Sequence, residues 1–178
     1  MALKTKNSLA PNLWCFCVKH LNLMIISVLD QLYSFSLVLN GQTFSFAAIY
    51  ASTSHVHWKK LWEDLSHLLQ MNVVPWDYMA DFNAILGAHE KLGACPALWE
   101  PCQDFSSLFD ENELIHLDTQ GARYTWCNGR ATRDSINIRL GRMICNDIWL
   151  SSWKKLSYCT LTRNYLDHHP LLFRCLIK

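Results

Sequence analysis

The stretch Met79-Ala80-Asp81-Phe82-Asn83 lies between two short apolar runs, residues 73–76 and 84–86. This arrangement predicts a buried strand that ends close to Asp81. Side chains two positions apart on an extended chain share a face, so Asp81 and Asn83 would point together into any cleft at the strand end. A carboxylate and an amide placed in this way can orient water or a phosphate oxygen, or hold a divalent cation. The same Asp-x-Asn pattern is also typical of a turn.

Asp81 belongs to a series of short motifs that extends along most of the chain. In order they are Ile49-Tyr50-Ala51-Ser52, Pro75-Trp76, Ala80-Asp81-Phe82-Asn83, Glu90-Lys91-Leu92-Gly93, Thr125-Trp126-Cys127-Asn128, Arg139-Leu140-Gly141-Arg142 and Leu166-Asp167-His168-His169-Pro170. The series resembles the endonuclease/exonuclease/phosphatase (DNase I-like) family, specifically its branch encoded by plant non-LTR (LINE-type) retrotransposons. In that branch the patterns read V-Y-A-S, P-W, G-D-F-N, E-K-x-G-G, T-W-S-N, R-L-D-R and S-D-H-x-P. The resemblance extends from about Leu13 to the C-terminus.

Length and composition indicate one globular domain. The chain has 178 residues, of which 51% are hydrophobic, and it contains eight tryptophans. This composition supports a sizeable core and excludes a disordered chain. No stretch reaches the roughly 18 apolar residues of a membrane span, and residues 1–13 lack the apolar core of a signal peptide, so we expect no membrane partner. We divide the chain into an unassigned segment, residues 1–12, and a truncated domain of the resembled family, residues 13–178.

The charges are distributed unevenly, although the net charge is only +1. Residues 1–120 hold six Lys/Arg against twelve Asp/Glu, whereas residues 121–178 hold ten against three. A basic half beside an acidic site suits a nuclease that binds DNA, because cations follow the phosphate backbone; a solvated basic face is the alternative. The eight cysteines form no C-x-x-C pair. We therefore expect buried, reduced thiols without disulfide partners, in a nuclear or cytoplasmic protein.

The hydrophobic pattern predicts more strands than helices. Strands are expected at residues 24–29, 33–39, 43–50, 73–79, 114–115, 124–127, 136–140, 156–161 and 171–177, and helices at residues 56–71, 102–111 and 146–150. Asn40-Gly41 predicts a tight hairpin, because both central residues of a type I′ turn need positive φ. Ser54 is placed to cap the first helix. The pattern fits an α/β sandwich, and the resemblance implies the four-layer type, with two mainly antiparallel sheets flanked by helices and incomplete at the N-terminus.

The resemblance also implies a chemistry, the hydrolysis of phosphodiesters with a divalent cation, usually Mg²⁺. Attack at phosphorus needs a base near neutral pH and a cation for the expelled oxyanion. By correspondence with the family motifs, Asp81 orients or deprotonates water, Asn83 holds a phosphate oxygen, and His168 is catalytic. Taken alone, His168 between Asp167 and a second His would suit an ordinary loop.

Two more residues, Tyr50 and Asn128, correspond to positions that contact the substrate phosphate. Asp167 is the residue that we assign to the metal. Tyr50 is also suited to packing at a strand end, and Asn128 is also suited to a turn before Gly129. The motif order predicts that the catalytic and phosphate-contacting side chains converge at one end of the sandwich.

The chain departs from the family pattern at three places. Ala80 replaces the family Gly, which predicts strain near Asp81 if the position needs positive φ. Gly141 replaces the Asp that partners the catalytic His, fixing its tautomer and stabilising its charged form. The family's N-terminal strand with an Asn and its element with a metal-binding Glu have no counterpart in residues 1–12. Glu90 does not replace that Glu, because it belongs to the Glu-Lys-x-Gly motif.

These observations support three hypotheses about function. The favoured one is a remnant of a retrotransposon-encoded, metal-dependent DNA endonuclease that is inactive or strongly impaired, with weak or absent Mg²⁺ binding. The second is an active phosphodiesterase in which other residues replace the missing Glu and the Asp lost at Gly141. The third is a non-catalytic nucleic-acid-binding or interaction module that uses the basic C-terminal half.

Overall fold

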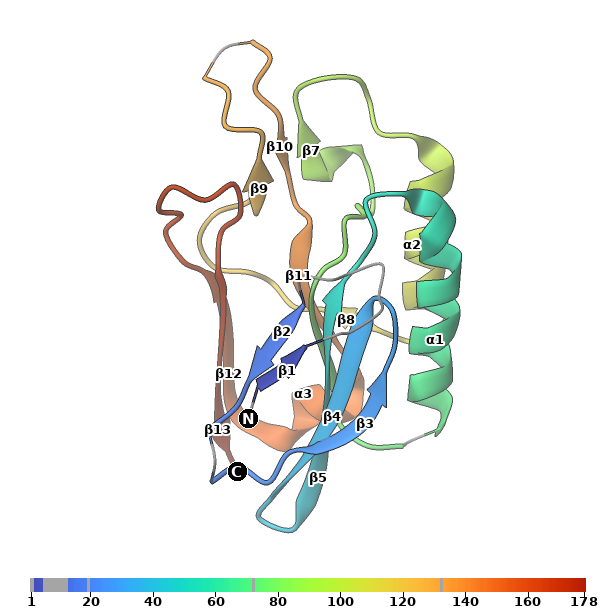
Figure 1. Cartoon of the computed structure of the whole chain (residues 1–178), viewed down its shortest axis with the longest axis vertical. Coiled ribbons are helices and arrows are strands. Elements are labelled where there is room, and N and C mark those ends of the chain that lie inside the picture. Colours follow the sequence, from blue (N-terminus) through green and yellow to red (C-terminus); the bar gives the residue numbers. More distant parts are fainter. Residues whose placement is uncertain (1, 5–12, 19, 72, 132) are drawn as a thin grey trace.

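A six-stranded sheet forms the centre of the computed structural model, which describes residues 2–4, 13–18, 20–71, 73–131 and 133–178. Its strands lie in the order β3 (Met24–Val28), β4 (Leu32–Leu39), β5 (Gln42–Tyr50), β6 (Trp76–Asp81), β11 (Gly141–Cys145) and β8 (Ile115–His116). All neighbours are antiparallel except β5 and β6, which are parallel. A parallel pair needs a long crossover connection, and α1 (Trp58–Met71) supplies it (Figure 1).

Two helices cover one face of this sheet (Figure 1). α1 follows a short 3-10 helix, η1 (His55–His57), and packs beside α2 (Trp99–Glu111). Trp62 of α1 stacks on Phe105 of α2 with ring centroids 5.0 Å apart. The ring centroid of Phe82 lies 5.2 Å from that of Phe105. This aromatic cluster anchors the chain directly after β6. No helix in the described part of the chain is both long enough and apolar enough to cross a membrane.

The opposite face carries a second, two-stranded antiparallel sheet, β12 (Trp153–Thr160) and β13 (Leu171–Ile177), together with α3 (Asp147–Ser152). The core between the two sheets contains Phe44 and Trp149, which are both buried. Their rings meet edge to face with centroids 5.8 Å apart, an arrangement that aromatic pairs prefer. These layers confirm the predicted α/β sandwich of two sheets flanked by helices.

Two smaller sheets complete the described structure. The first is antiparallel and consists of β7 (Lys91–Leu92), β10 (Asn137–Ile138) and β9 (Trp126–Cys127). It lies at one end of the molecule (Figure 1), and β7 follows the 3-10 helix η2 (Ala88–Glu90). The second pairs β1 (Ala2–Lys4) with β2 (Trp14–Phe16). The hydrophobic pattern did not predict this last pair.

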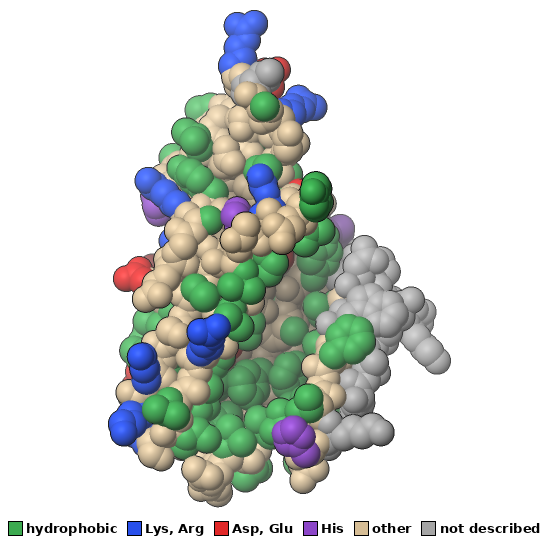
Figure 2. Space-filling model, turned by 90° about the vertical axis from the view of Figure 1, so that its left-hand side faces the viewer, with side chains coloured by type: hydrophobic (Ala, Val, Ile, Leu, Met, Phe, Trp, Pro, Cys, Tyr) green, Lys and Arg blue, Asp and Glu red, His purple; other side chains and the backbone are tan. Residues whose placement is uncertain are grey.

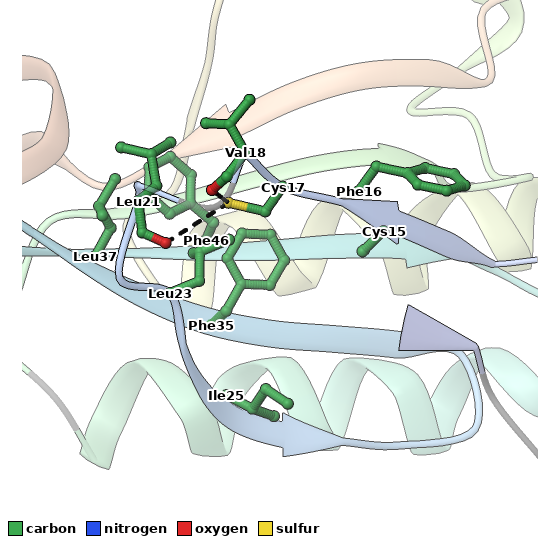
Figure 3. Close-up of a pocket in the computed structure, with 10 residues that line it drawn as sticks. All are labelled: Cys15, Phe16, Cys17, Val18, Leu21, Leu23, Ile25, Phe35, Leu37 and Phe46. Carbon is green, nitrogen blue, oxygen red and sulfur yellow. Dashed lines mark hydrogen bonds between the residues drawn. The ribbon is translucent and has the colours of Figure 1, made fainter. Parts of the chain in front are cut away.

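The two-stranded sheet is narrower than the six-stranded sheet, so part of the face between them is uncovered in the described chain. An apolar hollow of about 440 Å³ lies there, between β2 and strands β3 to β5. Figure 3 shows its lining residues, which are Cys15, Phe16, Cys17, Val18, Leu21, Leu23, Ile25, Phe35, Leu37 and Phe46. In the view of Figure 2, hydrophobic side chains gather in a recess on this side of the molecule.

Strand β11 corrects the sequence prediction. The pattern predicted a strand at residues 136–140, but only Asn137–Ile138 is a strand there, and a longer central strand begins at Gly141. All five residues of β11 are buried, including Arg142. A glycine and a charged residue at its start interrupted the apolar run that normally reveals a buried strand.

The start of α1 also differs from the prediction. Ser54 makes no side-chain capping hydrogen bond. Gln31 stabilises this segment instead: its Nε2 donates to the carbonyl of His57 (3.0 Å), and its Oε1 accepts from the backbone N–H of Ser52 (2.6 Å). A side chain from the turn between β3 and β4 thus replaces the expected local cap.

The cysteines are less uniformly buried than expected. Cys102, Cys127 and Cys145 are buried, but Cys95 and Cys175 are exposed. Burial, reinforced by the charge of nearby Asp77, raises the pKa of Cys145 to about 12. Its thiol therefore stays protonated and acts as a small apolar group.

Candidate functional site

Three adjacent strands bring predicted site positions side by side. Asp81 ends β6, and it pairs with Tyr50 at the end of β5 and with Gly141 at the start of β11. Register partners on neighbouring strands point to the same face, so these positions form a row across the sheet. The row faces the second sheet, because Ile49 and Ala80, which alternate with it, lie in the core beneath the helices.

The backbone turns sharply after Asp81. Phe82 is completely buried, and Asn83 has a φ of 48°, a left-handed conformation that Asn tolerates better than most residues. The backbone N–H of Asn83 donates to Oδ1 of Asp81 (3.2 Å), and its Nδ2 donates to the carbonyl of Ala51 (2.6 Å). The Asp-x-Asn segment is therefore a turn and, at the same time, a fixed pair of polar side chains.

The predicted strain at Ala80 is wrong. Ala80 lies inside β6, has no positive φ, and pairs with Ile49 and Arg142 on the neighbouring strands. A methyl group fits this extended conformation. The left-handed residue of the motif is Asn83, three positions later.

The loop between β12 and β13 carries His168 back to the end of β6. An isolated bridge joins His168 to Trp126 of β9, and the backbone N–H of Cys127 donates to the carbonyl of Asp167 (3.0 Å). These contacts fix the loop against the small three-stranded sheet. As a result, Nδ1 of His168 lies 3.6 Å from Oδ2 of Asp81.

Asp81 is the more buried partner of this pair. Its side chain is 16% exposed, whereas that of His168 is 37% exposed. Burial raises the pKa of Asp81 above its usual value; the charge of His168 and the N–H of Asn83 oppose this shift, and the charge of Asp167 adds to it. A carboxylate with a raised pKa accepts a proton more readily near neutral pH. The environment therefore suits a base, and the catalytic role of Asp81 stays a prediction.

At position 141 the structure shows what replaces the carboxylate of the resembled motif. Oγ1 of Thr125 accepts hydrogen bonds from the backbone N–H groups of Leu140 (2.9 Å) and Gly141 (2.7 Å). A Cβ atom on Gly141 would lie 3.1 Å from Cδ1 of Leu171 and 3.4 Å from Oγ1 of Thr125. Within the described chain, Asp81 is the only carboxylate in ion-pair contact with His168.

Two of the sequence motifs form one structural unit that the sequence reasoning missed. Arg142 is fully buried, and its Nη1 and Nη2 donate to Oε1 (3.0 Å) and Oε2 (2.8 Å) of Glu90. Nη2 also donates to the carbonyls of Ala84 (3.1 Å) and Arg139 (2.7 Å), and Glu90 accepts from the N–H of Leu86 (2.7 Å). Glu90 therefore ties the loop after β6 to β11. The opposite charges of Glu90 and Arg142 within two of the motifs were the available signal.

Asn128 lies on the hairpin that connects β9 and β10, and its side chain is engaged there. Its Nδ2 donates to the carbonyl of Asp134 (2.8 Å), and its Oδ1 accepts from the backbone N–H groups of Ile136 (3.0 Å) and Arg130 (3.3 Å). These bonds shape the hairpin tip, as expected of a turn residue. A phosphate contact of Asn128 stays a prediction, as does that of Tyr50, which lies beside Asp81.

The described residues contain no group of three His, Cys, Asp or Glu side chains arranged to hold a metal ion. Asp167, the residue assigned to the metal, is exposed, and its Oδ2 accepts from Nε1 of Trp126 (3.2 Å). Mg²⁺ demands near-octahedral oxygen coordination and commonly uses one or two carboxylates with water and substrate phosphates. Asp81 and Asp167 do not by themselves fit a tightly bound Mg²⁺ ion.

Solved nuclease structures share this arrangement of layers. The endonuclease domain of TRAS1, a telomere-specific non-LTR retrotransposon, matches with a TM-score of 0.70 and 12% identity over 98% of this chain and 79% of that domain. The 3′-5′ exonuclease NExo from Neisseria meningitidis matches with a TM-score of 0.55 and 16% identity, over 88% of this chain and 70% of that enzyme. The chain has an endonuclease/exonuclease/phosphatase-type fold.

The endonuclease/exonuclease/phosphatase-type fold is also found in the beta toxin of Staphylococcus aureus, with a TM-score of 0.57 and 9% identity. That match covers 82% of this chain, which spans only 57% of the toxin structure. At such identities the similarity establishes the fold and not the activity. No family model matches the sequence, and no curated protein matches it.

Proposed function

We propose that the chain is a remnant of a metal-dependent DNA endonuclease domain from a LINE-type retrotransposon of plants, in which catalysis is lost or strongly impaired. The fold similarity to a retrotransposon endonuclease domain supports a nuclease origin. The series of motifs around Asp81 and His168 supports the narrower branch. The surroundings of Asp81 support the loss of activity.

The observation that carries the proposal is that the Asp81 carboxylate would have to perform two catalytic roles. A base must take a proton from the attacking water, and a catalytic imidazole needs an acidic partner that orients it and stabilises its charged form. Asp81 is the carboxylate beside His168, while Gly141 contributes none. If Asp81 pairs with the imidazolium it is a weaker base, and if it acts on water the imidazole has no acidic partner. Loss of the acidic partner lowers turnover by about 10⁴-fold in the Ser-His-Asp triad.

Weak or absent Mg²⁺ binding is part of the same proposal. An ion held through Asp81 and Asp167 alone would depend on water and substrate phosphates for its remaining ligands. Asp167 would also have to leave the indole N–H of Trp126, which now donates to it. The chain's own residues therefore retain the means to orient water and a phosphate oxygen but little to neutralise the developing charge.

A non-catalytic nucleic-acid-binding module is the second candidate function, and one surface feature favours it. Arg130 and Arg133 are exposed on the β9–β10 hairpin, which projects at one end of the molecule (Figure 1). Arg123, which precedes β9, is exposed as well. Exposed cations neutralise backbone phosphates without reading sequence. Such binding requires neither a metal nor a carboxylate at position 141.

A plasmid nicking assay in Mg²⁺ tests the proposed function. The unmodified chain should leave supercoiled DNA intact, because its imidazole and metal ligands are both incomplete. Gly141→Asp alone should restore little activity, since it supplies a partner for the imidazole and not the metal ligands, and His168→Ala in that background should remove any gain. Efficient Mg²⁺-dependent nicking by the unmodified chain contradicts the proposal.

A further inference from the structure

The two-stranded sheet of β12 and β13 packs one side on the core and presents the other to solvent. Tyr158 and Phe173 are register partners, and both face the core. Because side chains alternate along a strand, Arg174 faces outward, and so do Lys155 and Leu176, which pair with each other. These three residues are exposed. The sheet forms the layer opposite α1 and α2 (Figure 1).

This sheet carries charge of one sign. β12 and residues 171–178 contain four exposed cations and no Asp or Glu; the cations are Lys154, Lys155, Arg174 and Lys178. None of the four is in a salt bridge within the described part of the chain. Figure 2 looks onto this side of the molecule, and Lys and Arg side chains gather at its lower left. Like charges held close together favour contact with a surface of opposite charge.

The helices on the other side of the molecule supply such a surface. Residues 93–122, which include α2, contain six Asp/Glu and no Lys/Arg. A groove of about 600 Å³ lies between α1 and α2, and Glu63, Asp104 and Glu111 line it. All three carboxylates are exposed, and none is in a salt bridge among the described residues. Lys59 is the one cation among the lining residues, so the groove is acidic.

The floor of this groove is apolar and contains an unsatisfied donor. Trp62 and Leu108 line the groove and are buried. Nε1 of Trp62, a residue that is 8% exposed, has no hydrogen-bond partner in the described structure. Protein interfaces commonly combine an apolar centre with a polar rim. The outer side of the β12–β13 sheet has the matching pattern, because Leu172 and Leu176 lie among its cations.

We propose that the outer side of the β12–β13 sheet docks on the α1–α2 groove of a second copy of this chain. Opposite charges attract the two surfaces and fix their register, and the leucines meet the apolar floor. The two surfaces lie on opposite sides of each copy (Figure 1), so the contact is head to tail. Each end of such a pair retains a free surface, and assembly therefore continues beyond the dimer. No residue of the candidate site takes part, so the contact is independent of the proposed function.

Reversing the charge of one surface at a time gives the sharpest test. The sheet-face variant, Lys155→Glu with Arg174→Glu, makes the outer side of β12–β13 acidic. The helix-face variant, Asp104→Lys with Glu111→Lys, makes the wall of the groove basic. All four positions are exposed, so the substitutions leave the core unchanged. Each variant alone presents two surfaces of like charge, whereas a mixture of the two variants again offers an acidic surface to every basic one.

The control variant is Arg130→Glu with Arg133→Glu on the exposed β9–β10 hairpin. It changes the net charge by the same amount as the sheet-face variant, at a place outside both surfaces. Sedimentation equilibrium at several protein concentrations measures the mass of the assemblies. The buffer contains a reductant, because Cys95 and Cys175 are exposed and would otherwise link copies covalently. Far-UV circular dichroism checks that each variant is folded.

The unmodified chain and the control variant should form dimers and larger assemblies that dissociate as salt rises from about 0.05 M to about 0.5 M, because salt screens exposed charges. The sheet-face variant and the helix-face variant should each associate at least roughly tenfold more weakly. An equimolar mixture of these two variants should associate as the unmodified chain does. If the helix-face variant does not fold, Asp104→Asn with Glu111→Gln removes the same charges and should weaken association to a similar extent.

Several outcomes overturn the head-to-tail contact. They are an unmodified chain that stays monomeric at every concentration, association that is insensitive to salt, association that survives in the sheet-face variant, and a mixture of folded variants that does not associate. Binding of duplex DNA by a monomeric unmodified chain, lost in the sheet-face variant, would assign the outer side of β12–β13 to nucleic acid instead. None of these results depends on nicking, so they leave the proposed function to be judged by its own assay.

Discussion

Nδ1 of His168 lies 3.6 Å from Oδ2 of Asp81, and the strand position that pairs with Asp81 on β11 is Gly141. We predict that Gly141→Asp introduces a carboxylate that draws the imidazole away from Asp81. A Cβ atom at position 141 would lie 3.1 Å from Cδ1 of Leu171, so Gly141→Asp alone should lose some stability. The double variant Gly141→Asp with Leu171→Ala should relieve this close contact. A crystal structure of the double variant checks this, and an unchanged distance between His168 and Asp81 would contradict it.

Asp77 should make the stability of the fold depend on pH. It is fully buried, and neither carboxylate oxygen has a hydrogen-bond partner among the described residues, so burial raises its pKa well above the usual value. Above the unfolded pKa of about 3.9 the unfolded chain ionises while the folded chain keeps the proton. This group therefore favours folding at low pH and loses about 1.4 kcal/mol of that advantage per pH unit until the folded pKa is passed.

Asp77→Asn removes this titration with little change in shape. Its melting temperature should exceed that of the unmodified chain at neutral pH, and the difference should grow between pH 5 and pH 8. Asp77→Leu should stabilise further, because an unpartnered buried polar group costs about 1–3 kcal/mol. Thermal unfolding followed by circular dichroism at several pH values gives the comparison. Parallel profiles for the unmodified chain and Asp77→Asn would show that Asp77 is not protonated in the fold.

The buried pair of Glu90 and Arg142 should be necessary for folding. Burial alone would raise the pKa of Glu90, but the hydrogen bonds and charge of Arg142 outweigh it, so the pKa lies below its usual value. Removing one partner of a buried pair costs about 3–5 kcal/mol, which corresponds to a loss of roughly 6–20 °C in melting temperature for a chain of this size.

A double-variant cycle separates the loss of the pair from the loss of packing. Glu90→Leu and Arg142→Met should each be strongly destabilising, whereas the two combined should recover part of the loss, because no unpaired charge remains. Additive effects in chemical denaturation would indicate that the two side chains do not depend on each other.

The exposed arginines of the β9–β10 hairpin should govern the salt dependence of DNA binding. Arg130→Ala with Arg133→Ala should lower the slope of log K against log[salt] by about two, without changing preference among sequences. Lys59→Ala with Lys60→Ala, on the exposed face of α1, is the matched control. Equal slopes for both double variants would place the DNA elsewhere.

Local chemistry explains why some elements were predictable from sequence. The Asn40-Gly41 hairpin was predicted from its turn residues, and both have positive φ, 50° and 79°. The C-terminal strand, residues 171–177, was predicted with the bounds that β13 has. The hairpin is determined by its two adjacent turn residues. The apolar run of residues 171–177 identifies the strand locally, although its partner β12 lies earlier in the chain.

The elements that were missed depend on distant partners. Arg142 can lie in the central strand β11 only because Glu90, 52 positions away, binds its guanidinium. The approach of His168 to Asp81 was predicted through the resemblance of the motifs, whereas the engagement of the Asn128 amide within its own hairpin depends on a tip conformation that the pattern does not specify. Burial of Asp77 likewise follows from its place between Phe46 and Cys145 on neighbouring strands.

The most direct test of the account compares the unmodified chain with Asp81→Ala in single-turnover nicking of supercoiled plasmid, with enzyme in excess and Mg²⁺ at millimolar concentration. Because Asp81 cannot serve both water and His168, both proteins should give the same background rate. A rate for the unmodified chain at least tenfold above that of Asp81→Ala, dependent on Mg²⁺, would contradict it and show that the site is active.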